Sequence, residues 1–269
     1  MFSEDLELKN YGKRTIDNYV SQVKCFLEQH QKVATKPSEI SERQIKEWLL
    51  KSNSINGRKH RISAVKLFYR LTGKQPLKFK HIEYPKADKK LPIVLSVEEI
   101  QKMFSVCDNL KHKVILALLY SAGLRVGELI NLKWQHIDRS RMIINIIQAK
   151  GNKDRQVMLA PQLIPLLEKY WEEYKSKEFV LNGQFGLQYS STSVGEVVKQ
   201  LASKAGLNKR VYTHLLRHCS FTHLVEAGTD INLVQKLAGH SNVKTTLIYT
   251  HISHNLISKI PSPLERIAV

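Results

Sequence analysis

Apolar residues in the first part of the chain recur at the spacing of an α-helix. One such set is Ile16, Tyr19, Val20, Val23, Phe26 and Leu27. Ser41 followed by Gln44 has the spacing of a capping box, which predicts that another helix begins there. Residues 62–71 carry a third helical apolar pattern. Together these patterns predict a small helical bundle over residues 1–82.

The pattern changes at the next segment. Residues 83–92 contain two prolines and a run of charged side chains, a composition typical of an extended linker. Beyond the linker, Ser96 and Glu99 predict a further capped helix. The strongly apolar run 113–122 predicts a helix in the core of a second domain, and Gly123 is expected to end it.

A β-hairpin is predicted in the middle of this second domain. Residues 142–147 and 156–159 are rich in strand-forming side chains and enclose turn-forming residues, with Lys150 at the shoulder of the turn. A helix is expected to begin near Val126, before the hairpin. Later helical patterns cover residues 161–174, 192–205, 213–227, 231–237 and 245–252.

The predicted fold class is therefore mainly α. A helical bundle is followed, over residues 93–253, by a mostly helical domain with a small antiparallel β-sheet. Residues 254–269 form a short tail with apolar positions and two prolines, for which we expect a short helix and an extended end.

The charge of the chain indicates what kind of partner it binds. The 269 residues include 42 lysines and arginines against 24 acids, a formal net charge of +18. A polyanion is the simplest partner for such a chain, and nucleic acid is the commonest polyanion. Residues 51–80 contain no acid, and aromatic side chains interleave with the basic ones, as expected of a surface that follows phosphates or, more plainly, of a solvated helix face. The candidate DNA-binding residues in this stretch are Arg58, Lys59, Arg61 and Lys66.

The cysteines and the apolar runs bear on the compartment. Cys25, Cys107 and Cys219 are far apart and match neither a disulfide framework nor a zinc motif. Cys25 and Cys107 lie in apolar-periodic segments, which predicts that both are buried. No apolar run is as long as a membrane span, and the acidic start lacks the core of a signal peptide. These features predict a reducing, cytoplasmic setting and no membrane partner.

Five short segments carry chemistry-bearing side chains. They are residues 122–129 (AGLRVGEL), Lys150, residues 214–218 (HLLRH), residues 239–240 (GH) and Tyr249. An arginine binds phosphate oxygens through a two-point fork, and a tyrosine hydroxyl can act as a covalent nucleophile. In a strongly basic chain this set indicates an enzyme that cuts a DNA strand by attaching itself to the strand.

In order and in spacing, including the nine residues from His240 to Tyr249, these segments resemble the active-site series of the tyrosine recombinases, also called phage integrases. The resemblance is closest to the small Xer-type members and extends over the whole chain. It implies a SAM-like core-binding domain at residues 1–82, a linker at 83–92, a catalytic domain at 93–253, and a tail at 254–269 that contacts a neighbouring protomer. Each segment alone is a weak signal, whereas five in the same order are specific.

The resemblance also implies the main chemical roles. Arg125 and Arg217 would hold the nonbridging oxygens of the scissile phosphate and stabilise the charge of the transition state. Tyr249 would attack phosphorus and form a 3′-phosphotyrosyl link. Lys150 would protonate the departing 5′ oxygen as general acid, with Lys153 as the next candidate for that role.

The remaining roles are supporting ones. By the same resemblance, His214 would help with the proton of Tyr249, His240 would donate to a nonbridging oxygen, and Glu128 would support the site one helical turn from Arg125. Other histidines, expected to be ordinary structural residues, are His218, His223 and His251. Because the bond energy stays in the phosphotyrosine and arginines carry the charge, no ATP, metal or other cofactor is expected.

Two departures from the family pattern concern packing behind the site. Cys219 follows the 214–218 segment where the family commonly has serine, and Ala238 precedes Gly239 where it commonly has leucine. Neither replaces a nucleophile or an arginine.

The implied assembly is four protomers on two specific sites of double-stranded DNA, exchanging strands through a Holliday junction. A need for a second recombinase stays open, as does the choice between chromosome-dimer resolution and integration, excision or inversion by a mobile element. One alternative is a monomeric enzyme like the type IB topoisomerases, and the apolar tail argues against it. The other is a noncatalytic DNA-binding accessory protein, against which Arg125, Arg217 and Tyr249 argue.

Overall fold

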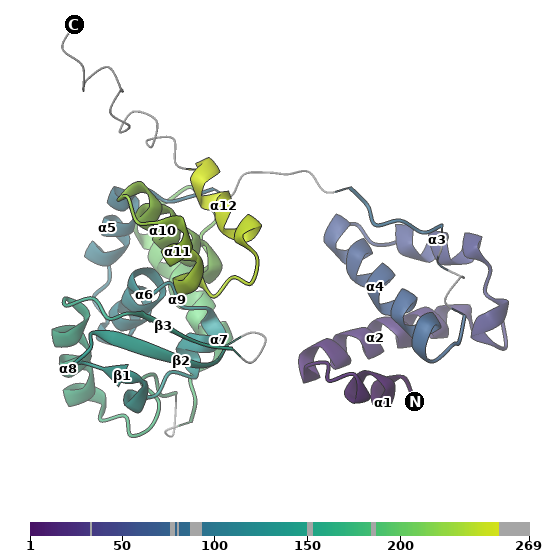
Figure 1. The fold of residues 1–269 in the computed structure, drawn as a ribbon, viewed down its shortest axis with the longest axis horizontal. Coiled ribbons are helices and arrows are strands. Elements are labelled where there is room, and N and C mark those ends of the chain that lie inside the picture. Colours follow the sequence, from purple (N-terminus) through teal and green to yellow (C-terminus); the bar gives the residue numbers. More distant parts are fainter. Residues whose placement is uncertain are drawn as a thin grey trace, which may run out of the picture. The chain divides into compact units, whose positions relative to one another are not determined.

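The computed structural model describes residues 1–32, 34–75, 79, 81–86, 93–149, 153–183 and 187–252. The chain divides into two compact units, residues 1–89 and 90–269 (Figure 1). Each unit has its own buried apolar core. The predicted fold class, mainly α with a small antiparallel sheet, is confirmed. Among the described residues, no helix combines the length and the apolar character that crossing a membrane requires.

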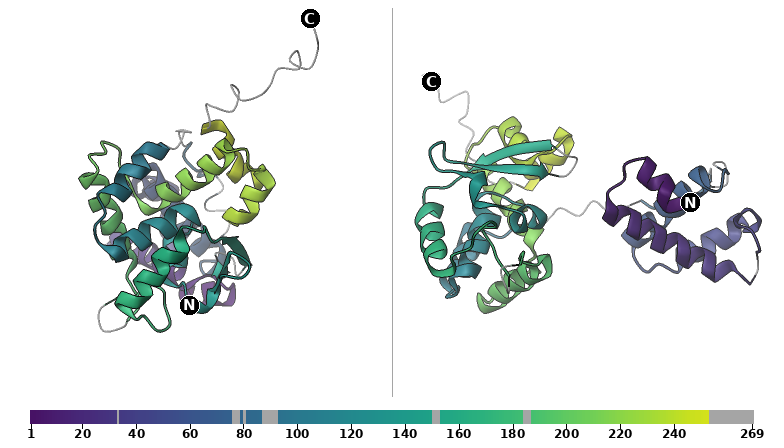
Figure 2. Two further views of the ribbon diagram at one scale, coloured as in Figure 1. Left: turned by 90° about the vertical axis from the view of Figure 1, so that its left-hand side faces the viewer. Right: turned by 90° about the horizontal axis from the view of Figure 1, so that it is seen from below.

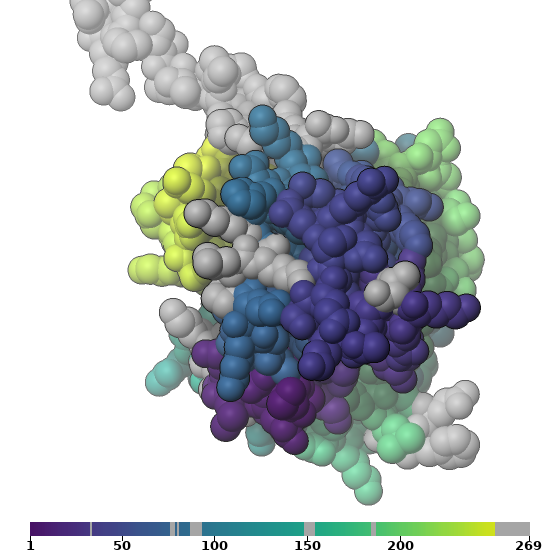
Figure 3. Space-filling model, turned by 90° about the vertical axis from the view of Figure 1, so that its right-hand side faces the viewer, coloured from purple at the N-terminus to yellow at the C-terminus, as the bar shows by residue number. Residues whose placement is uncertain are grey.

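The first unit is a bundle of helices. They are α1 (Phe2–Leu8), α2 (Lys13–His30), α3 (Glu42–Leu50) and α4 (Ile55–Leu71). The predicted capping box starts α3, because the Ser41 hydroxyl accepts a hydrogen bond from the backbone N–H of Gln44. Helix α1 was not predicted from the sequence, because its buried side chains Phe2 and Leu6 span only one turn. Figure 3 shows α1, in purple, against the blue segment that contains α4, and the two helices are in contact.

The aromatic residues of the acid-free stretch belong to the core of this unit. Phe68, Tyr69 and Phe79 are all nearly inaccessible to solvent, and the Tyr69 ring packs between those of Phe68 and Phe79. On α4, the basic residues therefore lie on the partly exposed outer side, and the aromatic residues Phe68 and Tyr69 lie on the buried inner side.

The two cysteine predictions have different outcomes. Cys107 is buried, as predicted, whereas the prediction for Cys25 is wrong, because this side chain is exposed. The apolar face of α2 is defined by its buried residues Ile16, Val23 and Phe26. Cys25 lies two positions after Val23, which on a helix is close to the opposite side.

The second unit surrounds one buried helix. Its elements are α5 (Val97–Ser105), α6 (Leu110–Ser121), α7 (Val126–Ile130), β1 (Ile137–Asp138), β2 (Ile143–Ala149), β3 (Lys153–Met158), α8 (Leu163–Tyr174), α9 (Ser191–Lys204), α10 (Thr213–Glu226), α11 (Ile231–Ala238) and α12 (Val243–Ile252). The predicted core helix is α6, in which six successive residues from Val114 to Leu119 are buried. A helix that is apolar on all sides must be covered on all sides, and α8, α9 and α10 all contact α6.

The predicted hairpin is formed by β2 and β3, and β1 extends it into an antiparallel sheet of order β1-β2-β3. Ile144 lies opposite Val157, and Ile146 lies opposite Arg155. Side chains alternate across a strand, so Arg155 shares the inward face of β3 with Val157. Figure 2 shows this sheet beside α11, which contacts β3. Lys150, which the sequence predicts at the shoulder of the hairpin turn, and the tail at 254–269 lie outside the described residues.

The turn at Gly123 places the first arginine segment. After α6 ends, Gly123 adopts a φ of +57°, and a Cβ at this position would stand 2.7 Å from Cζ of Phe221. Glycine fits here because it adopts the left-handed conformation without strain and has no Cβ to collide with the Phe221 ring. The chain then reaches Arg125, which is the N-cap residue of α7.

Candidate active site

Arg217 lies at the centre of the chemistry-bearing segments and is fully buried on α10. Its two terminal nitrogens donate to the backbone oxygens of Gly123 and Ala238, and its guanidinium stands 4.8 Å from the centre of the Phe221 ring. Burial, together with the charges of nearby arginines, lowers the pKa of Arg217 to about 9, so that the side chain stays cationic at neutral pH. These contacts fix the cation against two other segments of the chain and against a ring of its own helix.

Glu128 on α7 is the acid that joins the arginines. Its oxygens accept hydrogen bonds from the backbone N–H of Arg125 at 2.8 Å and from Nη1 of Arg125 at 2.7 Å. Arg155 donates to both oxygens, at 2.6 and 2.7 Å. Burial opposes ionisation of Glu128, but the hydrogen bonds from Arg155 and Arg125 outweigh it and lower its pKa to about 2. The carboxylate is therefore charged at every physiological pH.

These contacts leave an excess of positive charge. Arg125, Arg155 and Arg217 stand within 4.0 Å of the single carboxylate of Glu128, so three cations face one anion. The side chain of Arg125 is 24% exposed, compared with 6% for Arg155 and 1% for Arg217. Arg125 is consequently the arginine most open to an incoming anion, and its fork matches the geometry of a phosphate.

Tyr249 on α12 packs into the same cluster and is 1% exposed. Its ring centre lies 5.6 Å from that of Phe221, 5.7 Å from His218 and 6.2 Å from His240. Burial raises the pKa of the Tyr249 hydroxyl, and the charges of Arg217 and Arg125 partly offset that rise. A nucleophilic role therefore requires that its proton be transferred as it attacks.

Neutral histidines surround the tyrosine. Burial, reinforced by neighbouring positive charge, lowers the pKa of His218 and of His240 to about 4. His240 Nδ1 lies 3.0 Å from the Thr246 hydroxyl. If that hydroxyl donates to Nδ1, the ring presents Nε2–H as a donor. His214, which is exposed, touches this group through its ring, 4.5 Å from that of His218.

Sequence reasoning treated His218 as an ordinary structural residue, but the structure places its ring between those of His214 and Tyr249. The available signal was its spacing, four residues after His214 on one helix, which puts both rings on one face. His223 has bonding typical of a structural residue, to the Tyr120 hydroxyl and the Leu95 carbonyl oxygen. The side chain of His251 lies outside the described residues.

The other predicted site residues lie elsewhere. Arg58, Lys59, Arg61 and Lys66 are on α4 of the first unit and are all partly exposed. Arg61 donates to the Trp48 carbonyl oxygen at 2.9 Å and stacks on the Trp48 ring, so it has a structural task as well. Lys66 lies 5.8 Å from the centre of the Tyr84 ring.

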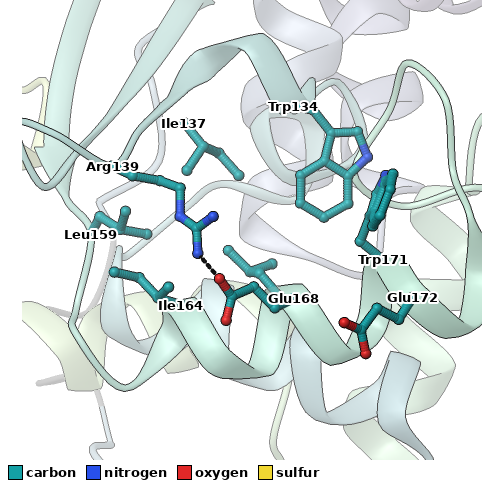
Figure 4. A pocket seen from close by; sticks show the side chains of 9 residues that line it. Trp134, Ile137, Arg139, Leu159, Ile164, Glu168, Trp171 and Glu172 are labelled. Atoms are coloured by element: carbon teal, nitrogen blue, oxygen red, sulfur yellow. Dashed lines mark hydrogen bonds and ion pairs between the residues drawn. The ribbon is translucent and has the colours of Figure 1, made fainter.

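A pocket of about 440 Å³ in the second unit contains none of the candidate catalytic residues. Trp134 and Trp171 line one end of it, and the ion pair between Arg139 and Glu168 lies across it (Figure 4). The chemistry of the arginine and tyrosine cluster is therefore separate from this pocket.

The neutral histidines predict acid sensitivity. The usual pKa of 6.5 applies to the unfolded chain, whereas the folded values of His218 and His240 are about 4. As pH falls from 6.5 towards 4, the unfolded chain therefore takes up protons first, and the stability that these residues contribute above pH 6.5 is lost. Thermal melts of the full chain across this range should show a falling Tm.

The control for this prediction uses substitutions of the same kind. The double variant His218→Asn and His240→Asn should show a shallower decline of Tm with pH, while replacing the exposed His60 by Asn should leave the decline unchanged. An equal decline in the double variant and the wild type would contradict the prediction.

Comparison with known proteins gives the same result for both units. A model described as the phage integrase family matches residues 94–255, and a model described as the phage integrase N-terminal SAM-like domain matches residues 1–78. The chain is 35% identical over 259 residues to tyrosine recombinase XerA of Pyrococcus horikoshii, covering 94% of this chain and 88% of that protein. It is 32% identical over 273 residues to tyrosine recombinase XerD of Oceanobacillus iheyensis, covering 93% and 88%.

Solved structures extend the likeness to three dimensions. A crystal structure of XerA recombinase matches with a TM-score of 0.59 at 28% identity and 97% coverage of each chain. XerH site-specific recombinase bound to palindromic difH substrate shares the fold, with a TM-score of 0.76 at 23% identity, over 96% of this chain and 82% of that one. Since the family models match in both units and the relatives cover nearly the whole chain, this chain belongs to the phage integrase family, as a tyrosine recombinase of the Xer type.

Proposed function

We propose that this chain recombines DNA at specific sites by cutting and rejoining strands through a 3′-phosphotyrosyl intermediate. The observation that carries the proposal is the cluster of Tyr249 with Arg125 and Arg217, in a basic chain of this family. Arg217 and Arg125 each donate to the carbonyl oxygen of Ala238, so their guanidinium groups meet at one point. A phosphate at that point faces two cations and a nearby tyrosine.

The chemistry balances without a cofactor. The oxygen of Tyr249 attacks phosphorus as its proton passes to a neutral histidine of the cluster, and the bond from phosphorus to the 5′ oxygen breaks. Arg125 and Arg217 stabilise the charge that develops on the nonbridging oxygens, and His240 adds a donor from its ring. A 5′ hydroxyl of the partner strand then attacks the phosphotyrosine, which restores Tyr249 and joins the strands.

We propose Lys150, which lies between β2 and β3 in the sequence, as the general acid for the 5′ oxygen. The Lys150→Ala variant should cleave ordinary DNA slowly, because general acids typically contribute about 100- to 10,000-fold to a rate. A substrate with sulfur in place of the bridging 5′ oxygen should restore cleavage, since a thiolate leaves without a proton. The measurement is single-turnover cleavage of both substrates. Equal defects on both would move the acid elsewhere, with Lys153→Ala the next variant to test.

DNA binding by the first unit is proposed to use the basic outer side of α4. Each phosphate contact steepens the fall of log K with log salt by about 0.9. Lys59→Gln, alone or with Arg58→Gln and Lys66→Gln, should therefore flatten the measured salt dependence of binding with little loss of stability. Arg61→Gln serves as the contrast, because Arg61 also holds the Trp48 carbonyl oxygen and its loss should lower Tm. An unchanged slope of log K against log salt in the triple variant would show that this side of α4 is only a solvated helix face.

The proposed function also implies an oligomeric assembly and a cellular location. We propose a homotetramer on two sites, with the division into residues 1–82, 83–92, 93–253 and the tail at 254–269 as its working parts. One related structure is a lambda integrase tetramer bound to a Holliday junction, which supports this arrangement as a fold-level analogy. Action in the cytoplasm is supported by three cysteines that are all unpaired. Partnership with a second recombinase is left to experiment.

Covalent capture tests the function directly. The wild-type chain, expressed in its own cells, is denatured, and the DNA fragments that stay attached are sequenced and rebuilt as a synthetic duplex, here called the captured duplex. Two copies placed on one plasmid should recombine. Relaxation of plasmids that lack the captured sequence, without exchange, would instead indicate an enzyme like the type IB topoisomerases. Binding without any attached DNA would indicate an accessory protein.

A further inference from the structure

Arg155 is a charged residue on an inward-facing position of β3, and no step of the proposed reaction involves it. Its side chain is 6% exposed. It donates from Nε to the Leu237 carbonyl oxygen at 2.8 Å and from both terminal nitrogens to Glu128. One side chain thus joins β3, the end of α11 and the start of α7, which are three of the segments that surround the site.

The surrounding backbone is shaped to admit this side chain. Gly239 has a φ of +60°, and a Cβ on it would stand 2.8 Å from Cδ of Arg155. Glycine at the position before His240 therefore leaves the space that the Arg155 side chain occupies. All three guanidinium nitrogens of Arg155 are hydrogen-bonded, and Gly239 leaves room for its side chain. The local structure is therefore specific for an arginine at this position.

The charge balance shows what Arg155 does there. Glu128 has two oxygens, and each one accepts a hydrogen bond from both Arg125 and Arg155. With Arg155 in place, the carboxylate is neutralised by a two-point pair that does not involve phosphate. Without Arg155, the same buried carboxylate has Arg125 as its nearest cation, and the fork of Arg125 would turn to face it.

We propose that Arg155 is a positioning residue for DNA cleavage, which neutralises Glu128 and thereby keeps the guanidinium of Arg125 directed at the scissile phosphate. The proposal rests on the function proposed above, in which Arg125 binds that phosphate. Arg155 does not touch the DNA in this account. It acts through Glu128, and its loss misplaces a group that does touch the DNA.

The expected effect is on the rate of cleavage rather than on DNA binding. Misplacement of a reacting group by about 1 Å can cost about 100-fold in rate, and we expect Arg155→Ala to slow cleavage of the captured duplex by that order. Arg155→Lys should be intermediate, because an ammonium keeps the charge but lacks the fork that spans both oxygens of Glu128. The matched control is Arg139→Ala, which removes an arginine from an ion pair with Glu168 at the surface of the same unit.

A second substitution separates positioning from support of the fold. Glu128→Gln, added to Arg155→Ala, removes the negative charge that would capture Arg125. The double variant should therefore cleave faster than Arg155→Ala alone, with a rise of about 10-fold if half of the loss in barrier height is recovered. A merely structural Arg155 predicts the reverse, because the double variant then lacks two buried partners. If Arg155→Ala does not fold in a thermal melt, the same pair of measurements is made on Arg155→Lys.

The outcomes are distinct. No covalent adduct with the wild-type chain would overturn the proposed function itself. An adduct with the wild type, combined with a wild-type rate in Arg155→Ala or with a double variant no faster than the single one, would overturn the role of Arg155 alone. Slow cleavage by Arg155→Ala, normal binding of the captured duplex and recovery on adding Glu128→Gln would support it.

Discussion

Replacing Tyr249 with phenylalanine is expected to abolish covalent attachment to DNA while leaving binding of the captured duplex intact. The substitution removes a single oxygen from a ring that packs against Phe221, His218 and His240. The shape and the apolar contacts of the ring remain, so the fold should survive. Without that oxygen no bond to phosphorus can form. A denaturing gel of protein mixed with labelled captured duplex measures the adduct.

A matched control is available in the same unit. Tyr170 is also fully buried, and its hydroxyl donates to Asn182 at 3.4 Å. Tyr170→Phe should therefore retain the adduct at the wild-type level. An adduct of normal yield in Tyr249→Phe would assign the nucleophile to another residue and remove the main support for the proposed function.

The burial of Tyr249 also affects when its hydroxyl can react. In the structure the hydroxyl is inaccessible, and burial raises its pKa. Ionisation of the free tyrosine is thus disfavoured before DNA arrives. In the proposed mechanism, the phosphate that Arg125 and Arg217 hold enters the same cluster, so binding places phosphorus beside the Tyr249 hydroxyl.

The helical framework could be predicted from the sequence because its signals are local. The capping boxes at Ser41 and Ser96 start helices where the sequence places them, and the apolar run that becomes α6 is buried along its length. Strand β1 has only two residues, and the buried residues of α1 span a single turn. Neither segment is long enough to show a repeating pattern of apolar residues. Cys25 shows the opposite failure, since lying within a periodic segment does not place a residue on its buried face.

The residues of the candidate site could be predicted from their types and order in the sequence. The contacts between residues far apart in the sequence could not. Arg125, Arg217, His240 and Tyr249 come together as their resemblance to a known series implies. Arg155 belongs to none of the five segments that the sequence singles out. Its partner Glu128 is 27 residues away, and no spacing rule links a strand residue to a helix residue across that interval. The inward position of a charged residue on a strand was the one signal that a buried acid faced it.

Replacing Arg217 is expected to have the second large effect, and on two quantities at once. Loss of one preorganised donor to a developing negative charge typically costs about 100- to 1,000-fold in rate, which we expect for Arg217→Ala in single-turnover cleavage. The same variant leaves the carbonyl oxygen of Gly123 without its buried donor, whereas that of Ala238 keeps the hydrogen bond from Arg125. Each unsatisfied buried group costs about 1–3 kcal/mol, so the free energy of unfolding of the second unit should also fall.

Arg217→Lys separates the two effects. Lysine keeps a positive charge in the site, but one ammonium group cannot reproduce a planar fork that meets two carbonyl oxygens and, in the proposed mechanism, a phosphate. We therefore expect a Tm between those of the wild type and Arg217→Ala, with cleavage still slowed by about 100-fold or more. Arg139→Ala should change neither quantity appreciably, because that arginine is 55% exposed and exposed ion pairs contribute little. Cleavage at the wild-type rate by Arg217→Lys would show that the site needs only a charge there, and the two-point grip on the phosphate would have to be assigned to Arg125 alone.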